Sequence, residues 1–253
     1  MDQSRSSRLS FWGYGTAALS LDRTMSNQIL RTLPGEEHAN IVAYSTRVTL
    51  AQNFVICRPG QPIEHVYFLE SGLVSLLATG RDGRAVETAL VGPEGLVGSS
   101  VVLGPPQANG GAVVRLAGDA LRAPIAPFLE SCERSPALRS LVNRHLGLVL
   151  SQAEQNAFCH ALHSIEQRFC RWVLQVSDNS GSNVLEITQE LCAQALGVQR
   201  TSVSMIAHSL QLAGSIRTRR GKIEILDRSS LQNAACECYE ELKQRHAAYL
   251  KAA

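Results

Sequence analysis

The chain has little of what membrane and secreted proteins need. No apolar run in its 253 residues approaches the ~20 residues of a membrane-spanning helix. The opening residues, MDQSRSSRLSFWGYG, contain no apolar signal core, so we expect no secretion by that route. The seven cysteines are odd in number and scattered, which fits reduced thiols better than a disulfide framework. We therefore expect a cytoplasmic protein with no membrane partner.

Sequence signals of catalysis are missing too. The chain has no P-loop, no G-x-G-x-x-G and no G-x-S-x-G, and its His, Asp and Cys residues show no recognisable pairing. We therefore expect no enzyme activity and assign no catalytic residues. The 45% hydrophobic and 18% charged residues that are present are typical of a globular protein of one large or two small domains.

Metal-ligand spacing is weak in this sequence. Cys236 and Cys238 form a C-x-C pair, but no second pair accompanies it. His160 and His163 lie three residues apart, next to Cys159, and their more common role is as surface or core residues. We assign no metal ligands and expect no cofactor.

The stretch Ile187–Asp227 carries the strongest local signals in the chain. The Thr188 hydroxyl can cap a first helix, and Gly197 suits the left-handed turn that ends it. Apolar spacing predicts a second helix from Gln199 to Leu212, and alternation predicts two short strands within residues 216–225. Helix, turn, helix and hairpin are the layout of a winged helix-turn-helix, whose second helix enters the DNA major groove.

Charge is concentrated in this same stretch. Residues 199–228 contain six basic and two acidic side chains, a local balance of +4, while the whole chain carries only +2. This favours nucleic-acid binding over the alternative, a plain helical hairpin with a solvated basic loop. The predicted DNA-binding residues are Thr188, Gln199, Arg200, Thr201, Ser202, Ser204 and Met205 in the two helices, and Arg217, Arg219, Arg220 and Lys222 in the hairpin.

Short apolar runs bounded by turn residues fill the stretch from Arg47 to about Arg122. Runs of four to seven residues such as FVIC, VYFLE, LVSLLAT and AVETALV alternate with RPGQ, SG and GRDGR. Repeated strands at this spacing predict an antiparallel β-roll of the jelly-roll type, with a hairpin turn at Asp82-Gly83. A short helical lead-in is expected from Met25 to Ser45.

Helical spacing returns from Pro136 to Ala161, with a stripe close to a heptad. This long helix packs either on its own roll or on the same helix of a second copy, and a homodimer would also deliver two reading helices to two half-sites. Further helices are expected over His163–Val176 and Leu231–Leu250, with SDNSGSN as a loop after the first.

This order of elements resembles the CRP/FNR family of bacterial transcription regulators. The resemblance covers about residues 27–230 and rests on FVICRPGQPIEHVYFLESGLVSLLATGRDGRAVETALVGPEGLVGSS and ITQELCAQALGVQRTSVSMIAHSLQLAGSI. It implies a cyclic-nucleotide-binding-type roll, a dimer helix and a DNA-reading second helix. Arg200 matches the arginine that opens this helix in the family. Thr201 stands where cyclic-AMP-type members carry a glutamate, which puts their operator sequence in doubt.

The expected ligand pocket departs further from the family pattern. Ser99 or Ser100 stands where a glutamate meets the ribose, and Gly110-Gly111 stand where an Arg-Ser pair meets the cyclic phosphate. Arg115 comes four to five positions late. These four residues, Ser99, Ser100, Gly110 and Gly111, are the candidate effector pocket, but we expect no ordinary binding of cyclic AMP or cyclic GMP.

The sequence therefore predicts an α+β protein: an N-terminal antiparallel β-roll, a long dimerisation helix and a C-terminal winged helix-turn-helix. The expected divisions are a loose extension (1–25), the roll (26–134), the dimer helix (135–161), the DNA-binding domain (162–230) and a C-terminal helix (231–253). The expected function is a homodimeric, sequence-specific transcription regulator that binds palindromic double-stranded DNA, with RNA polymerase as a candidate partner. The alternative is a sensor of the same architecture that binds an unknown, non-standard effector.

Overall fold

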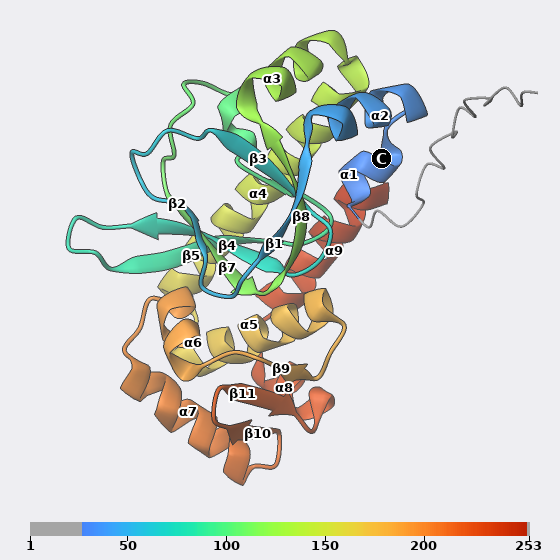
Figure 1. The fold of residues 1–253 in the computed structure, drawn as a ribbon. Coiled ribbons are helices and arrows are strands. Elements are labelled where there is room, and N and C mark those ends of the chain that lie inside the picture. Colours follow the sequence, from blue (N-terminus) through green and yellow to red (C-terminus); the bar gives the residue numbers. More distant parts are fainter. Residues whose placement is uncertain (1–26, 252–253) are drawn as a thin grey trace, which may run out of the picture.

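The computed structural model describes residues 27–251, and the loose extension expected over residues 1–25 lies outside them. A β-roll forms one half of the molecule and a smaller helical module with a hairpin forms the other, with long helices running beside both (Figure 1). Within residues 27–251, no helix combines the length and apolarity that crossing a bilayer requires.

Two four-stranded antiparallel sheets form the roll. The first has the order β1 (Thr46–Leu50), β8 (Gly118–Pro124), β3 (His65–Leu69), β6 (Leu96–Val97), and the second β2 (Val55–Cys57), β7 (Gly111–Leu116), β4 (Leu73–Thr79), β5 (Ala85–Val91). Apolar side chains on alternate positions of both sheets fill the space between them; they include Leu69, Val74, Val91, Val97, Val114 and Ala120. The predicted turn at Asp82-Gly83 joins β4 to β5, and Gly80 N donates to Arg84 O at 2.8 Å.

Four helices close one end of the roll. The lead-in forms α1 (Gln28–Thr32) and α2 (Gly35–Tyr44), and β8 leads directly into α3 (Ile125–Arg134), which the sequence pattern did not predict. A one-turn 3-10 helix, η1, covers Ser99–Val102.

The long helix is α4 (Pro136–Leu162), which Ser135 caps by accepting from Leu138 N at 2.9 Å. Pro136 occupies the first turn, as predicted, because its missing N–H has no helical partner there.

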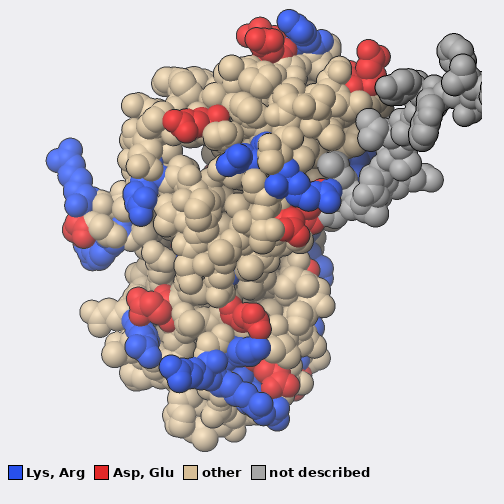
Figure 2. Space-filling model, in the orientation of Figure 1, with Lys and Arg blue, Asp and Glu red and all other residues tan. Residues whose placement is uncertain are grey.

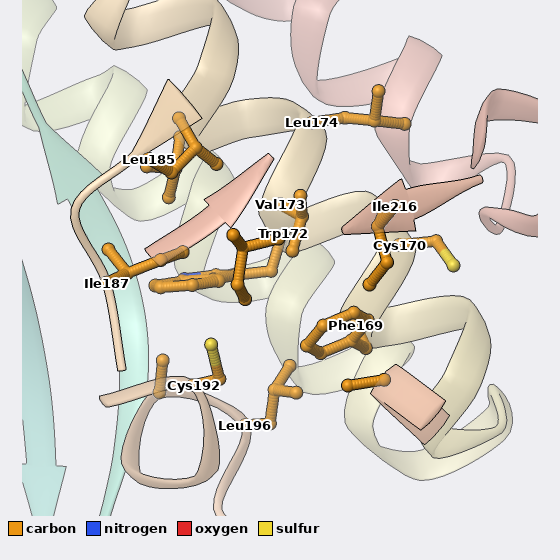
Figure 3. Close-up of a cluster of buried hydrophobic side chains, with 14 of the residues drawn as sticks. Phe169, Cys170, Trp172, Val173, Leu174, Leu185, Ile187, Cys192, Leu196 and Ile216 are labelled. Carbon is orange, nitrogen blue, oxygen red and sulfur yellow. The ribbon is translucent and has the colours of Figure 1, made fainter. Parts of the chain in front are cut away.

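The second half of the molecule is the winged module. It contains α5 (Ile165–Ser180), β9 (Val184–Leu185), α6 (Gln189–Leu196), α7 (Arg200–Leu212), β10 (Ile216–Arg219), β11 (Lys222–Ile225) and α8 (Arg228–Ala234). Figure 3 shows Phe169 and Trp172 of α5 among side chains from α6, β10 and the segment before α6. Both aromatic side chains are 0–1% exposed, so truncating either to alanine should cost about 3–5 kcal/mol.

Two expectations for the C-terminal half are wrong. SDNSGSN is not entirely a loop, because α5 continues to Ser180 and ends at Gly181. The single helix expected over Leu231–Leu250 is two helices, α8 and α9 (Cys238–Lys251), separated by extended backbone at Ala235. The break lets α8 pack on α5 while α9 turns back along α4 toward α1 (Figure 1), so that each helix buries its apolar side against a different neighbour.

A buried carboxyl group joins the roll to the winged module. Glu87 of β5 is 4% exposed; its Oε1 accepts from Trp172 Nε1 at 2.9 Å and its Oε2 accepts from the Ser75 hydroxyl. That hydroxyl also accepts from Arg115 Nε at 2.7 Å, and Arg115 Nη1 donates to Gln194 Oε1 of α6 at 2.8 Å. Side chains from three strands and two helices therefore have to be in place at the same time for these bonds to form. This network holds the winged module in its position on the roll.

Burial changes the ionisation of this network. It raises the pKa of Glu87 to about 7, against the opposing effects of the Ser75 hydrogen bond and the Arg115 charge. Burial likewise lowers the pKa of Arg115. A tenfold change in an acid constant corresponds to roughly 1.4 kcal/mol. The raised pKa of Glu87 therefore means that burial disfavours its ionised form, relative to its protonated form, by about 3 kcal/mol.

Replacing Glu87 by glutamine should flatten the pH dependence of stability. The folded state holds the Glu87 proton more tightly than the unfolded state, so this contribution to stability is present at pH below about 4.5 and is lost as pH rises through about 7. Glutamine cannot ionise, yet its carbonyl still accepts from Trp172. Urea unfolding from about pH 5 to pH 8 should show a shallower decline for Glu87→Gln than for the wild type.

Glu133→Gln is the matched control, because Glu133 is exposed on α3. It should keep the wild-type pH profile. A Glu87→Gln protein that loses the same stability at every pH would show that the carboxyl is ionised throughout.

Candidate nucleic-acid interface

The first helix of the predicted pair is set by local residues. The Thr188 hydroxyl accepts from Leu191 N at 3.1 Å and so caps α6, as predicted. Gly197 ends the helix with φ 64°, in the left-handed region that favours glycine. A side chain there would also press on Val86 of the roll, because an added Cβ would lie 3.1 Å from a Val86 methyl carbon. The turn therefore positions α7 both within the module and against β5.

The second helix, α7, has one buried and one exposed face. Val203, Ala207 and Leu210 are buried against the module, whereas Arg200 and Thr201 open the helix on the exposed side. Met205 lies on that exposed side and is 74% exposed. An exposed Arg, Thr and Met at the start of a helix form a surface that can meet base edges and thymine methyl groups.

Hydrogen bonds hold the start of α7 against α6. The Ser204 hydroxyl donates to Gln189 Oε1 at 2.7 Å, so this predicted DNA contact also ties the two helices together. Gln199 is the N-cap of α7 but its side chain makes no capping bond. Ser202, the remaining predicted residue, is half-buried in the first turn. The uncapped first-turn N–H groups, with the positive end of the helix dipole, favour an anionic partner such as phosphate.

The wing, the hairpin of β10 and β11, carries the four predicted cations, of which two are in ion pairs and two are not. Arg217 pairs with Glu224 across the hairpin at 3.0 Å, and Lys222 pairs with Glu186 at 2.6 Å. Arg219 and Arg220 are exposed and make no ion pair with any residue that the structure describes. Figure 2 shows Lys and Arg side chains gathered in a band across the lower half of the molecule, over the wing strands.

The two acidic partners were not foreseen from the sequence. Strand register puts Glu224 directly opposite Arg217, so the alternation of the hairpin contained the signal for that pair. Glu186 lies in the segment after β9, which pairs with β11, and nothing local in the sequence points to its contact with Lys222.

The candidate effector residues lie in the roll. Ser99 is buried and Ser100 half-buried in η1, while Gly110 and Gly111 lie at the start of β7 beside Leu77 of β4. A Cβ at Gly110 would stand 2.3 Å from the Leu77 carbonyl oxygen, so close backbone packing explains this glycine without any ligand. Arg115, the basic side chain of β7, is fully buried and directed toward Ser75 and Gln194.

Comparison with known proteins matches both halves of this structure. Residues 47–135 match the family model of the cyclic nucleotide-binding domain, and residues 167–234 match that of the Crp-like helix-turn-helix domain. Together the two models cover more than half of the chain. They bracket α4, in the order expected from the sequence.

Individual relatives agree with the models. The transcriptional regulator SdrP of Thermus thermophilus is 28% identical over 189 residues, which are 72% of this chain and 90% of SdrP. A solved CRP/FNR-family regulator from the same organism is 27% identical with a TM-score of 0.63, over 75% of this chain and 98% of its own.

A more distant solved structure shares the fold. It is the c-di-GMP-responsive global regulator CLP of Xanthomonas campestris, 18% identical with a TM-score of 0.65 over 76% of this chain and 99% of its own. These models and relatives describe transcriptional regulators rather than enzymes. The chain belongs to the CRP/FNR family of transcriptional regulators.

Proposed function

We propose that the chain acts in the cytoplasm as a homodimer that reads a palindromic DNA site with α7 and binds the DNA backbone with the wing. RNA polymerase is its proposed protein partner. The observation that carries the DNA-reading role is the group of exposed cations, Arg200, Arg219 and Arg220, that have no ion pair among the described residues. A cation without an internal partner loses nothing within the protein when it binds an anionic ligand.

The roles of the cations follow from their positions. Arg200, at the start of α7, enters the major groove and donates to both acceptors of a guanine, a contact that discriminates by about 1–3 kcal/mol. Thr201 and Met205 make apolar contacts beside it. Arg219 and Arg220 bind phosphates, and Arg217 and Lys222 join them once their carboxylate partners are displaced. Thr188, at the start of α6, contacts backbone while Gln199, Ser202 and Ser204 line the approach to the groove.

The dimer face lies on α4. Leu150 is 60% exposed and Phe158 45% exposed, and Ala157 and Ala161 are exposed seven and eleven residues after Leu150. These spacings put the four side chains on one face of the helix, where the exposed Glu154 also lies. Pairing this face with its copy buries the four apolar side chains around Glu154 and sets two α7 helices about one DNA turn apart, roughly 34–36 Å.

The roll lacks the usual contacts to a cyclic nucleotide. Gly110 and Gly111 supply no charge for a cyclic phosphate, and Nε and Nη1 of Arg115 already donate to Ser75 and Gln194, which leaves only the buried Nη2 without a described partner. A phosphate buried without a cationic partner is strongly disfavoured. The regulator therefore binds DNA without cyclic AMP or cyclic GMP.

A second candidate is a regulator that responds to another small molecule. A cavity of about 350 Å³ between α1, α4 and α9 favours it, with Arg31, Arg144 and Glu94 among its lining residues. Since the Xanthomonas relative is described as c-di-GMP-responsive, that dinucleotide is the first ligand to test here. A change in DNA affinity on adding it would favour this candidate.

Removing Arg200 should weaken specific DNA binding. Genomic fragments bound by the purified wild-type protein supply the site, and Arg200→Ala should reduce affinity for it about tenfold to a hundredfold while changing nonspecific binding far less. Arg219→Ala should weaken both kinds of binding and lower the salt dependence by about one phosphate. Fluorescence anisotropy at several salt concentrations measures these effects.

Arg81→Ala is the matched control, because Arg81 is an exposed arginine on the β4–β5 turn of the roll. Its affinity should equal that of the wild type. If Arg200→Ala behaved like Arg81→Ala, α7 would not be the reading helix.

A charge on the α4 face should abolish the dimer. Leu150→Glu places a carboxylate in the apolar stripe without disturbing the monomer core, since Leu150 is already exposed. Sedimentation velocity should find a dimer for the wild type and a monomer for Leu150→Glu. Leu103→Glu, at a leucine that is 71% exposed on the roll, should remain a dimer. A dimeric Leu150→Glu protein would place the interface elsewhere.

Calorimetric titration of the full chain with cyclic AMP and cyclic GMP should detect no binding. The reason is that Gly110 and Gly111, at the position expected to meet the phosphate, offer no cationic side chain. Micromolar affinity for either nucleotide would contradict the proposed loss of the standard contacts.

A further inference from the structure

Four side chains with metal-binding atoms meet where the long helix ends. Cys159 and His163 lie in the last turn and C-cap of α4, and Cys236 and Cys238 lie at the junction of α8 and α9. Their ligand atoms all lie within 4.8 Å of one another. The sequence pattern gave no metal assignment because Cys159 and Cys236 are 77 residues apart, and only the return of α9 along α4 brings them together.

The distances suit one metal ion. Cys159 Sγ lies 3.5 Å from Cys236 Sγ, and Cys238 Sγ lies 3.5 Å from His163 Nδ1. Zinc–sulfur bonds of about 2.3 Å in a tetrahedron place neighbouring sulfurs roughly 3.8 Å apart. The four ligand atoms therefore already stand close to the spacing of a mononuclear tetrahedral site. An iron–sulfur cluster distributes its thiolates over several irons and needs wider spacing.

Residues around the four ligands provide the supporting bonds that metal sites need. His163 Nε2 lies 3.1 Å from Glu237 Oε1, which leaves Nδ1 toward the sulfurs as the free ligand atom. Gln155 Nε2 donates to Cys238 Sγ at 3.0 Å, a bond that stabilises a thiolate. A carboxylate on the far nitrogen of a histidine and an amide donor on a thiolate are both typical of the surroundings of zinc. His160, by contrast, bonds to Arg168 and stays outside the group.

The burial of the four-residue group and the charge beside it also favour a bound metal ion. The three cysteines are 0–4% exposed. Arg171 is 3% exposed and makes no ion pair with any described carboxylate; its Nη1 donates to Gln175 Oε1 at 3.0 Å, and its Nε has no hydrogen-bond partner. Its charge acts on both Cys159 and Cys236. Zn²⁺ with three thiolates and one neutral imidazole carries a net charge of −1, which would balance this buried guanidinium.

We propose that Cys159, His163, Cys236 and Cys238 bind one Zn²⁺ ion. Sulfur and nitrogen ligands in tetrahedral array select this metal, and four protein ligands leave no open position, so the site is structural rather than catalytic. It fastens the end of α4 to the start of α9. Since α4 passes into α5 directly after His163, the ion fixes the joint between the long helix and the winged module.

Metal analysis of the full chain tests the proposal. Protein purified under reducing conditions without chelator should contain about one zinc per chain, and Co²⁺ exchanged into it should show thiolate-to-cobalt charge transfer and tetrahedral visible bands. Cys236→Ser and His163→Ala should lose stoichiometric zinc, whereas Cys132→Ser, at a buried cysteine remote from the group, should keep it. Removing the ion with a chelator should lower the melting temperature of the wild type.

Loss of zinc in a ligand variant could also result from misfolding, so a variant of a residue that is not a ligand is needed as well. Glu237 is 66% exposed, so Glu237→Gln should fold normally yet bind zinc about 10–100-fold more weakly, because His163 loses its carboxylate. Glu240→Gln, at an exposed glutamate one helical turn away, should keep the wild-type affinity. A wild-type protein that takes up neither zinc nor cobalt would overturn the proposal. So would a Cys159–Cys236 disulfide in the reduced preparation, or iron with sulfide in place of zinc.

Discussion

The carboxyl group of Glu87 is the constraint on which the arrangement of the two halves depends. A carboxyl that is taken out of water needs hydrogen-bond donors, and leaving it without them costs several kcal/mol. Its donors come from β4 on the roll and from Trp172 on α5, and the same network reaches α6 through Arg115. All of these bonds are made together in the observed placement of the winged module. The direction in which α7 and the wing face follows from that placement.

The long helix α4 has apolar side chains on several of its sides, and each of these sides needs a partner that shields it from water. The roll covers one side through Leu141, Val142 and Leu148, and α9 covers another. The face with Leu150 and Phe158 is exposed. Because α4 contacts both the roll and α9, a shift in either one reaches the other through a single rigid helix.

Much of the DNA-binding module could be predicted from the sequence because its signals are local. The Thr188 cap, the Gly197 turn and the Arg220-Gly221 hairpin each depend on residues within a few positions of one another. Partners far apart in the chain could not be predicted. Glu87 lies in an alternating strand, where a glutamate is normally exposed, and its burial depends on partners distant in the chain, Trp172 above all.

The same limit explains the errors at the C-terminal end. The break at Ala235 follows from two separate packing partners of α8 and α9, which no local pattern contains. The grouping of Cys159 with Cys236 depends on that break. Residue pairs separated by 77 positions give no periodic signal, so the sequence could offer the C-x-C pair but not its complement.

The return of α9 along α4 also sets an order of events during synthesis. The helix that ends at Leu162 leaves the ribosome well before the segment that ends at Lys251 and covers one of its sides. At about 5–20 residues per second, the nascent chain carries that side uncovered for several seconds. An apolar helix exposed in this way can pair wrongly with a neighbouring nascent chain. The side of α4 that α9 covers is therefore protected only after α9 has been made.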